Sequence, residues 1–249
     1  MSERDDALRE LAPSGALRVA IALSPAASPF FAVRDPATGK PRGVTITLAN
    51  DLAADSGLPL RLVEYRNSGE ITDRADDEEW DATFMPADAE RAKRVAFTPP
   101  YALVESTYLI APTCSAQTIE EVDRPDVRVI AISDTATGRS AARSLKKATL
   151  NYAATVNEAA DSLGSGNADA LALSRDALAT LAPRFPGSRI LDGRFHAAGV
   201  AGAVPRNRPA ALRFLWTFIE RAKSSGAVKR ALDAAGLKYA AVAPPDGTA

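Results

Sequence analysis

The sequence predicts an α/β fold in which a mostly parallel sheet carries helices on both faces. Short apolar runs that alternate like strands are each followed by a segment with helical spacing. This rhythm occurs in both halves of the chain, and Gly57, Gly226 and Gly236 stand where helices are expected to end. With 249 residues, the chain is long enough for one large domain or for two lobes that each bury a core.

The first half begins with a short helical segment, which is followed by an apolar run with strand alternation. Prolines then disfavour helix in the loop that follows this run. Asp35 and Gly39 indicate a turn, and a helix is expected to end at Gly57, before Pro59. The acidic segment 73–79 is also expected to be helical. The expected helices of this half are 7–11, 46–56 and 73–79, residues 89–94 are expected to form a short helix or a turn, and the expected strands are 17–23, 60–65 and 81–85.

The second half repeats the alternation of strands and helices. Its expected strands are 127–132, 148–152, 168–173 and 188–191, and its expected helices are 138–147, 157–165, 175–181, 209–225 and 227–235. Strands that alternate with helices in this way argue for a mostly parallel sheet in each half.

Composition excludes several classes of function. Lys plus Arg total 30 and Asp plus Glu total 31, so a formal net charge of -1 gives no reason to expect nucleic acid or an anionic membrane as partner. Cys114 is the single cysteine, so no intramolecular disulfide can form; with His196 as the single histidine, a zinc site is not expected. No apolar run approaches the roughly 18–20 residues of a membrane span.

Targeting and catalytic motifs are also lacking in the sequence. The polar N-terminus has no apolar stretch of a secretory signal, so either the protein stays in the cytosol or its leader is missing from this sequence. Without a phosphate loop, a dinucleotide fingerprint or a Gly-x-Ser-x-Gly elbow, we expect no cofactor, no catalytic residues and no enzyme activity.

The most informative stretch lies before the middle of the chain. Residues 80–91 read Trp-Asp-Ala-Thr-Phe-Met-Pro-Ala-Asp-Ala-Glu-Arg, and residues 95–101 read Val-Ala-Phe-Thr-Pro-Pro-Tyr. This order resembles the family 3 extracellular solute-binding proteins, which bind polar amino acids and related solutes for importers. The resemblance covers roughly residues 17–237.

The resemblance implies a two-lobed fold of the periplasmic-binding-protein type II. Each lobe has a mostly parallel sheet flanked by helices, and two crossovers, at 103–112 and near 197–204, join the lobes. Lobe 1 is expected to be discontinuous. It takes residues 1–108 and 200–249, and lobe 2 takes residues 109–199.

In lobe 1, the resemblance places Arg91 as the clamp for a ligand carboxylate. A planar guanidinium offers two parallel donors to a carboxylate, although a solvated surface arginine is the alternative. Either Phe30 or Phe31 is expected to cover the ligand or to fill the core. Phe84 and Met85 end a strand where relatives contact the ligand, but strand alternation makes a core position equally reasonable.

In lobe 2, Thr135 and the backbone at Ala136 occupy the turn that meets the carboxylate in relatives. Ser174 stands where amino-acid binders of the family have an aspartate for the α-ammonium, and a serine supplies no charge. Glu105 is the expected compensation, with a solvent-facing role as its alternative. His196 lies near the return crossover, where it could line the site or be structural.

The predicted function is therefore capture of a small carboxylate-bearing or amino-acid-like ligand between two lobes by a monomer. The resemblance implies a periplasmic protein that serves the permease subunits of an ABC-type importer. A cytosolic sensor or orphan binding protein of the same fold is the alternative. A cyclohexadienyl-dehydratase-like enzyme, with Glu105 as its acid, is the less favoured one.

Overall fold

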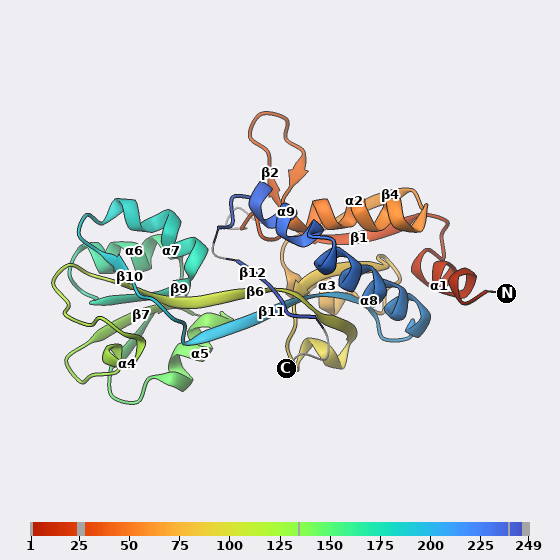
Figure 1. Ribbon diagram of the computed structural model, residues 1–249. Helices are drawn as coiled ribbons and strands as arrows, with labels where there is room; N and C mark the ends of the chain where they lie inside the picture. The colour runs from red at the N-terminus through yellow and green to blue at the C-terminus, as the bar shows by residue number, and fades with distance from the viewer. Residues whose placement is uncertain (1, 24–27, 134, 239, 246–249) are drawn as a thin grey trace. The chain divides into compact units, whose positions relative to one another are not determined.

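The computed structural model describes residues 2–23, 28–133, 135–238 and 240–245, and it has the predicted α/β class (Figure 1). The chain divides into two compact units: unit 1 is Met1–Leu103 with Gly199–Ala249, and unit 2 is Val104–Ala198. The chain leaves unit 1 within β6 (Val95–Ile110) and returns within β11 (His196–Pro205). The domain boundaries predicted from the sequence fall within the same two strands.

The sheet of unit 1 is built on three parallel strands. β1 (Leu17–Ala22) lies between β4 (Leu60–Tyr65) and β5 (Ala82–Pro86). β11 pairs antiparallel with β5, and β12 (Ala241–Val242) pairs antiparallel with β6. The carboxyl ends of β1, β4 and β5 therefore meet at one edge, where small molecules commonly bind in such sheets.

Helices cover both faces of this sheet. Successive strand residues point to opposite faces: a Cβ added to Gly202 of β11 would lie 2.9 Å from Leu215 of α8, whereas Ala203 packs in one core cluster with Ile71 of α3. Helix α8 thus packs on one face with α2 and α9, and α3 packs on the other (Figure 1). The helices of unit 1 are α1 (Glu3–Leu11), α2 (Val44–Ser56), α3 (Ser68–Asp73), α8 (Pro209–Ser224) and α9 (Ala227–Ala234).

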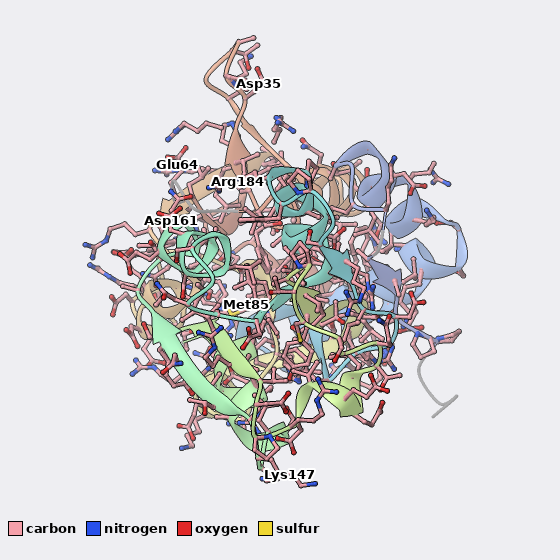
Figure 2. All side chains as sticks on the ribbon, turned by 90° about the vertical axis from the view of Figure 1, so that its left-hand side faces the viewer. Asp35, Glu64, Met85, Lys147, Asp161 and Arg184 are labelled. Carbon is pink, nitrogen blue, oxygen red and sulfur yellow. The ribbon has the colours of Figure 1, made fainter. Side chains whose placement is uncertain are left out.

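A small hairpin, β2 (Val33–Arg34) and β3 (Pro41–Arg42), projects from unit 1 with Asp35 in its turn (Figure 2). Gly43 follows the hairpin with φ 134°, and a Cβ at this position would lie 2.5 Å from the carbonyl oxygen of Phe31. Only glycine fits this approach, and α2 begins directly after it, two residues before the predicted start.

The predicted helix at 73–79 is wrong, because the helix lies earlier. Asn67 accepts a hydrogen bond from the backbone N–H of Glu70 at 2.9 Å and so caps the start of α3. After α3 the chain turns, and Trp80 packs back against this helix. Its indole Nε1 donates to the carbonyl oxygen of Ile71 at 3.1 Å.

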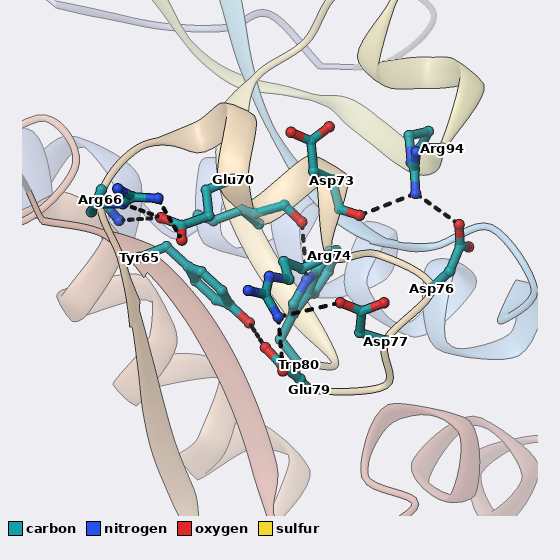
Figure 3. A network of polar contacts seen from close by, with 11 residues as sticks. Tyr65, Arg66, Glu70, Asp73, Arg74, Asp76, Asp77, Glu79, Trp80 and Arg94 are labelled. Carbon is teal, nitrogen blue, oxygen red and sulfur yellow. Dashed lines mark hydrogen bonds and ion pairs between the residues drawn. The ribbon is translucent and has the colours of Figure 1, made fainter.

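The acidic side chains after α3 pair with arginines instead of lining a helix (Figure 3). Arg74 Nη1 lies 3.5 Å from Asp77 and 3.3 Å from Glu79, and Arg94 Nη2 lies 3.0 Å from Asp76. Tyr65 donates to Glu79 at 2.9 Å. Two of the partners, Arg94 and Tyr65, lie outside the acidic segment in the sequence. These contacts hold the acidic segment after α3 as a series of turns.

Unit 2 has its own mostly parallel sheet. β7 (Arg128–Ile132) lies between β8 (Thr149–Ala153) and β9 (Ala170–Ser174), and it is parallel to both. The later part of β6 pairs antiparallel with β9, and β10 (Arg189–Ile190) pairs antiparallel with β6. The carboxyl ends of β7, β8 and β9 form a second edge.

The two faces of β7 have different partners in unit 2. Val129 and Ala131 pack in a cluster with Ala141 of α5, whereas Ile130 and Ile132 pack in a cluster with residues of α6 and α7. The helices of unit 2 are α4 (Ile119–Val122), α5 (Ala136–Ser144), α6 (Val156–Gly164) and α7 (Arg175–Leu181), which η2 (Ala182–Arg184) extends by one 3₁₀ turn.

Each unit contains the same arginine–aspartate clasp. Arg18 Nε and Nη2 donate to the two carboxylate oxygens of Asp81 at 2.9 and 2.7 Å, and the Arg18 backbone N–H adds a bond of 3.0 Å. Arg128 holds Asp169 through the same three groups at 2.9, 2.8 and 2.9 Å. Because each aspartate directly precedes a strand, β5 or β9, the clasp fixes that strand against its parallel neighbour.

The clasp of unit 1 is buried and has a second arginine. The Asp81 side chain is 0% exposed, and Arg208 Nη1 donates to its Oδ1 at 2.5 Å. Arg208 precedes α8, whose first backbone N–H groups donate to Glu10 of α1 at 2.6 and 3.0 Å. The Asp81 carboxylate therefore connects β1, β5 and the start of α8. Through Glu10, α1 also contacts the start of α8.

Removing the charge of Asp81 is expected to destabilise the protein strongly. Asp81→Asn should lower the free energy of unfolding by about 3–5 kcal/mol, because two largely buried guanidinium groups lose their counter-charge. Asp169→Asn is the matched control. Its partner Arg128 is 46% exposed, so the expected loss is about 1 kcal/mol or less. Urea unfolding followed by circular dichroism measures both, and equal losses would contradict this account.

Candidate functional site

Arg91 lies just beyond the carboxyl end of β5, in one 3₁₀ turn, η1 (Arg91–Lys93). Its backbone N–H donates to Asp88 Oδ1 at 2.9 Å, so Asp88 caps this turn. The guanidinium Nη1 donates to the carbonyl oxygen of Pro86 at 3.0 Å and to Asp88 Oδ2 at 2.9 Å, and Nη2 donates to Ser68 Oγ at 2.9 Å. These bonds join the end of β5 to the start of α3 and hold the guanidinium in one orientation.

Part of the Arg91 fork remains open. Nη1 uses both of its protons and Nη2 uses one, and the described part of the chain offers no partner to Nε or to the second Nη2 proton. Nε and Nη2 are the same two nitrogens with which Arg18 and Arg128 hold carboxylates. Since the Arg91 side chain is 24% exposed, a ligand carboxylate can take this place.

The aromatic residues of unit 1 form a buried cluster. Phe30 is 2% exposed and stacks on Tyr101 with ring centroids 6.3 Å apart, and Phe84 meets the same ring edge-on at 5.9 Å. The Tyr101 hydroxyl has no partner among the described residues, and burial raises its pKa above the ordinary value. Phe31, whose ring lies 5.3 Å from that of Phe30, is partly exposed and is the more accessible of the two predicted lid residues.

Phe84 and Met85 lie in the core of unit 1, with 3% and 1% exposure. Figure 2 labels Met85. Met85 packs in one cluster with Ile71 and Trp80. Their contact with a ligand stays a prediction, and a ligand at this strand end would meet backbone groups rather than these two side chains.

In unit 2, Thr135 follows β7 and caps α5. Its hydroxyl donates to the carbonyl oxygen of Ile132 at 2.9 Å and accepts from the backbone N–H of Gly138 at 3.0 Å. The close turn needs glycine at 138, since a Cβ would lie 2.5 Å from the Ile132 oxygen. This hydroxyl is thus engaged within the chain. Ala136 is the first residue of α5, and its side chain lies outside the described part.

A pair of hydroxyls that sequence reasoning missed lies at the same edge. Ser106 Oγ and Thr137 Oγ1 are 3.0 Å apart, and Ser106 is the strand partner of Ser174. Ser174 precedes α7 without a side-chain capping bond. The place of Thr137 and Ser174 just after parallel strands was the signal that could have grouped them; nothing local in the sequence assigns Ser106.

Glu105, next to Ser106, is held by two arginines of unit 2. Its Oε2 lies 3.7 Å from Arg175 Nε, and its Oε1 accepts from Arg194 Nη1. The carboxylate is 19% exposed. Because Glu105 precedes Ser106 in β6, its side chain points to the opposite face of the sheet from Ser106 and Ser174, towards Arg175 of α7, and it is already paired there.

His196 begins β11 and is half-buried. Burial lowers its pKa below the ordinary value, and the positive charge of Arg143 lowers it further. In the described ranges, no three His, Cys, Asp or Glu side chains form a group that could hold a metal ion. Across the same ranges, every helix is too short or too polar to cross a bilayer.

The comparisons with known proteins identify the family and the fold of the chain. Residues 19–235 match the profile of the bacterial extracellular solute-binding proteins, family 3. No curated protein sequence matches the chain.

Solved structures show the same fold. An ancestral amino acid-binding protein, described as a precursor of cyclohexadienyl dehydratase, is 24% identical with a TM-score of 0.70; the match covers 91% of this chain and 98% of the other. A binding component of an ABC transporter from Wolinella succinogenes, complexed with lysine, is 23% identical with a TM-score of 0.73, covering 89% and 95%. A substrate-binding protein from Streptococcus pneumoniae, bound to L-arginine, is 19% identical with a TM-score of 0.69, covering 92% and 97%.

The lowered pKa of His196 predicts a loss of stability in mild acid. As the pH falls, the unfolded chain protonates its histidine near 6.5 while the folded chain does not, so the free energy of unfolding should fall from that pH down to the lowered folded pKa. Urea unfolding at about pH 7.5 and about pH 5.5 should show a smaller loss for His196→Gln than for the unchanged protein. Identical losses in the two proteins would contradict the assignment.

Proposed function

We propose that this chain, which belongs to the bacterial extracellular solute-binding proteins of family 3, captures a small carboxylate-bearing or amino-acid-like ligand through Arg91. The observation that carries this proposal is the open side of the Arg91 guanidinium. Its Nη1 is fixed by Pro86 and Asp88, while Nε and one Nη2 proton remain for a ligand. A bidentate pair of this kind gives both affinity and orientation.

Unit 2, taken by itself, also offers polar groups at the carboxyl edge of its strands. Thr137, Ser106 and Ser174 offer hydroxyls, and the first N–H groups of α5 add the positive end of a helix dipole. Hydroxyls and N–H groups are suited to oxygen atoms of a small anion.

The role in transport follows from the family rather than from the site. Relatives of this fold bind lysine or L-arginine, according to their structures, and serve ABC transporters. We propose the same for this chain, with permease subunits as partners and the periplasm as its place of action. A cytosolic sensor that binds the same ligand is the alternative.

A dehydratase is the second candidate, because one structure of the fold is described as a precursor of such an enzyme. Glu105 is the acid that this reading requires. Both of its oxygens are paired with arginines, which leaves neither free for a proton transfer to a substrate and favours binding over catalysis. Turnover of a bound ligand, followed by mass spectrometry, would support the enzyme instead.

Arg91→Ala is expected to reduce carboxylate affinity by at least about 100-fold, because a desolvated bidentate pair is lost. Arg94→Ala is the matched control. Arg94 directly follows this turn and is 44% exposed, and its guanidinium bonds the carbonyl oxygen of Asp73 and the carboxylate of Asp76 (Figure 3). Isothermal titration calorimetry against amino acids and simple carboxylates measures both. Unchanged affinity in Arg91→Ala, or an equal loss in Arg94→Ala, would remove Arg91 from the site.

A further inference from the structure

An open pocket of about 350 Å³ lies on unit 1 where α1 packs against α8 (Figure 1). Its volume is in the range of pockets that hold small molecules. Residues of both helices line it, and Glu10 of α1 holds the helix pair together, because its carboxylate accepts from the first N–H groups of α8. The pocket is therefore built by two elements that are fixed to each other.

Part of the pocket lining is apolar. Ala7 and Ala210 are each 6% exposed, and Phe214 is half-buried. The guanidinium of Arg4 lies over the Phe214 ring, 5.5 Å from its centroid, and Arg4 Nη2 donates to the carbonyl oxygen of Asp55 at 2.9 Å. A ligand in this pocket would meet apolar area beside one cation that is already held in place.

Two more arginines, both on α8, line the pocket. Arg221 pairs with Asp55, whereas Arg213 is exposed and its guanidinium has no partner in the described part of the chain. The two arginines are eight residues apart, with Thr217 midway between them, so all three lie on one side of the helix. Among the described residues, Glu3 is the single acid of the lining, so the lining has a net positive charge, also when Asp55 is counted.

We propose that this pocket is a second binding site, built from other residues than the site at Arg91, for a small organic anion that joins a carboxylate or phosphate group to an apolar group. The anionic oxygens bind Arg213, whose free guanidinium can form a bidentate pair, and the apolar group lies against Phe214. The inference goes beyond the proposed function and does not depend on it. Residues 19–235 match the family profile, so the wall that α1 supplies lies outside the part that this profile describes.

The test is made in Arg91→Ala protein, so that carboxylate binding through Arg91 does not contribute. The probes are phenyl phosphate and benzoate, with inorganic phosphate as the anion without an apolar group and benzylamine as the cation. Calorimetric Kd values are measured in this background alone and with Arg213→Gln, Glu3→Gln or Arg61→Gln added. Arg61 is the matched control, because it is an exposed arginine of β4 that has no partner among the described residues and does not line the pocket.

We expect at least one of the two aromatic anions to bind with a Kd of about 1 mM or below, and to bind about fivefold or more tightly than inorganic phosphate. Arg213→Gln should weaken this binding by about fivefold, the scale of one solvent-exposed charge pair. Glu3→Gln should strengthen it by about twofold, because a like charge is removed from the lining. Arg61→Gln should leave the Kd unchanged.

Three results would overturn the inference. These are a panel in which neither aromatic anion binds, benzylamine or inorganic phosphate binding as tightly as the aromatic anions, and equal effects of Arg213→Gln and Arg61→Gln. The proposed function is judged separately, because it requires that Arg91→Ala loses carboxylate affinity, whereas this inference requires binding that Arg91→Ala retains.

Discussion

The buried carboxylate of Asp81 is the interaction on which the rest of unit 1 depends. It receives Arg18 from β1 and Arg208 from the start of α8, and it stands directly before β5. Arg91 follows the other end of that strand, where its guanidinium bonds the carbonyl oxygen of Pro86. The position of Arg91 is therefore set by a strand whose opposite end is fixed by an ion pair.

The arginines of this chain have different roles, according to how many of their N–H groups are hydrogen-bonded within the chain. Arg18 and Arg175 use their guanidinium groups on partners inside their own unit and act as parts of the frame. Arg91 has an Nε–H and one Nη2 proton without a partner in the described part of the chain, and Arg194, itself 51% exposed, pairs with the partly buried carboxylate of Glu105. Residue type alone does not separate these roles, because all four are arginines beside acids. The number of open donors and the exposed fraction do separate them.

Much of the fold could be predicted because alternation of apolar residues and glycine stops are local signals. The helix expected at 73–79 failed because its acidic residues pair with arginines such as Arg94, and acidity by itself does not distinguish a helix from paired turns. Arg91 was selected from its motif, and its contact with a ligand stays a prediction. The pairing of Glu105 could not, since Arg194 lies 89 residues further along the chain. The resemblance placed Thr135 in the ligand turn, and only the hydrogen bonds show that its hydroxyl caps α5; its contact with a ligand stays a prediction.

The contact between Trp80 and α3 gives the protein an internal optical reporter. Both tryptophans of the sequence, Trp80 and Trp216, belong to unit 1, so tryptophan emission reports this unit alone. The indole of Trp80 is 1% exposed and bonds the carbonyl oxygen of Ile71, one turn beyond Ser68, whose hydroxyl holds Arg91. Ser68 and Ile71 both belong to α3, so a displacement of the Arg91 guanidinium would reach this indole through one helix. The emission wavelength and lifetime of tryptophan can therefore be used, without an added label, to follow binding at the Arg91 guanidinium.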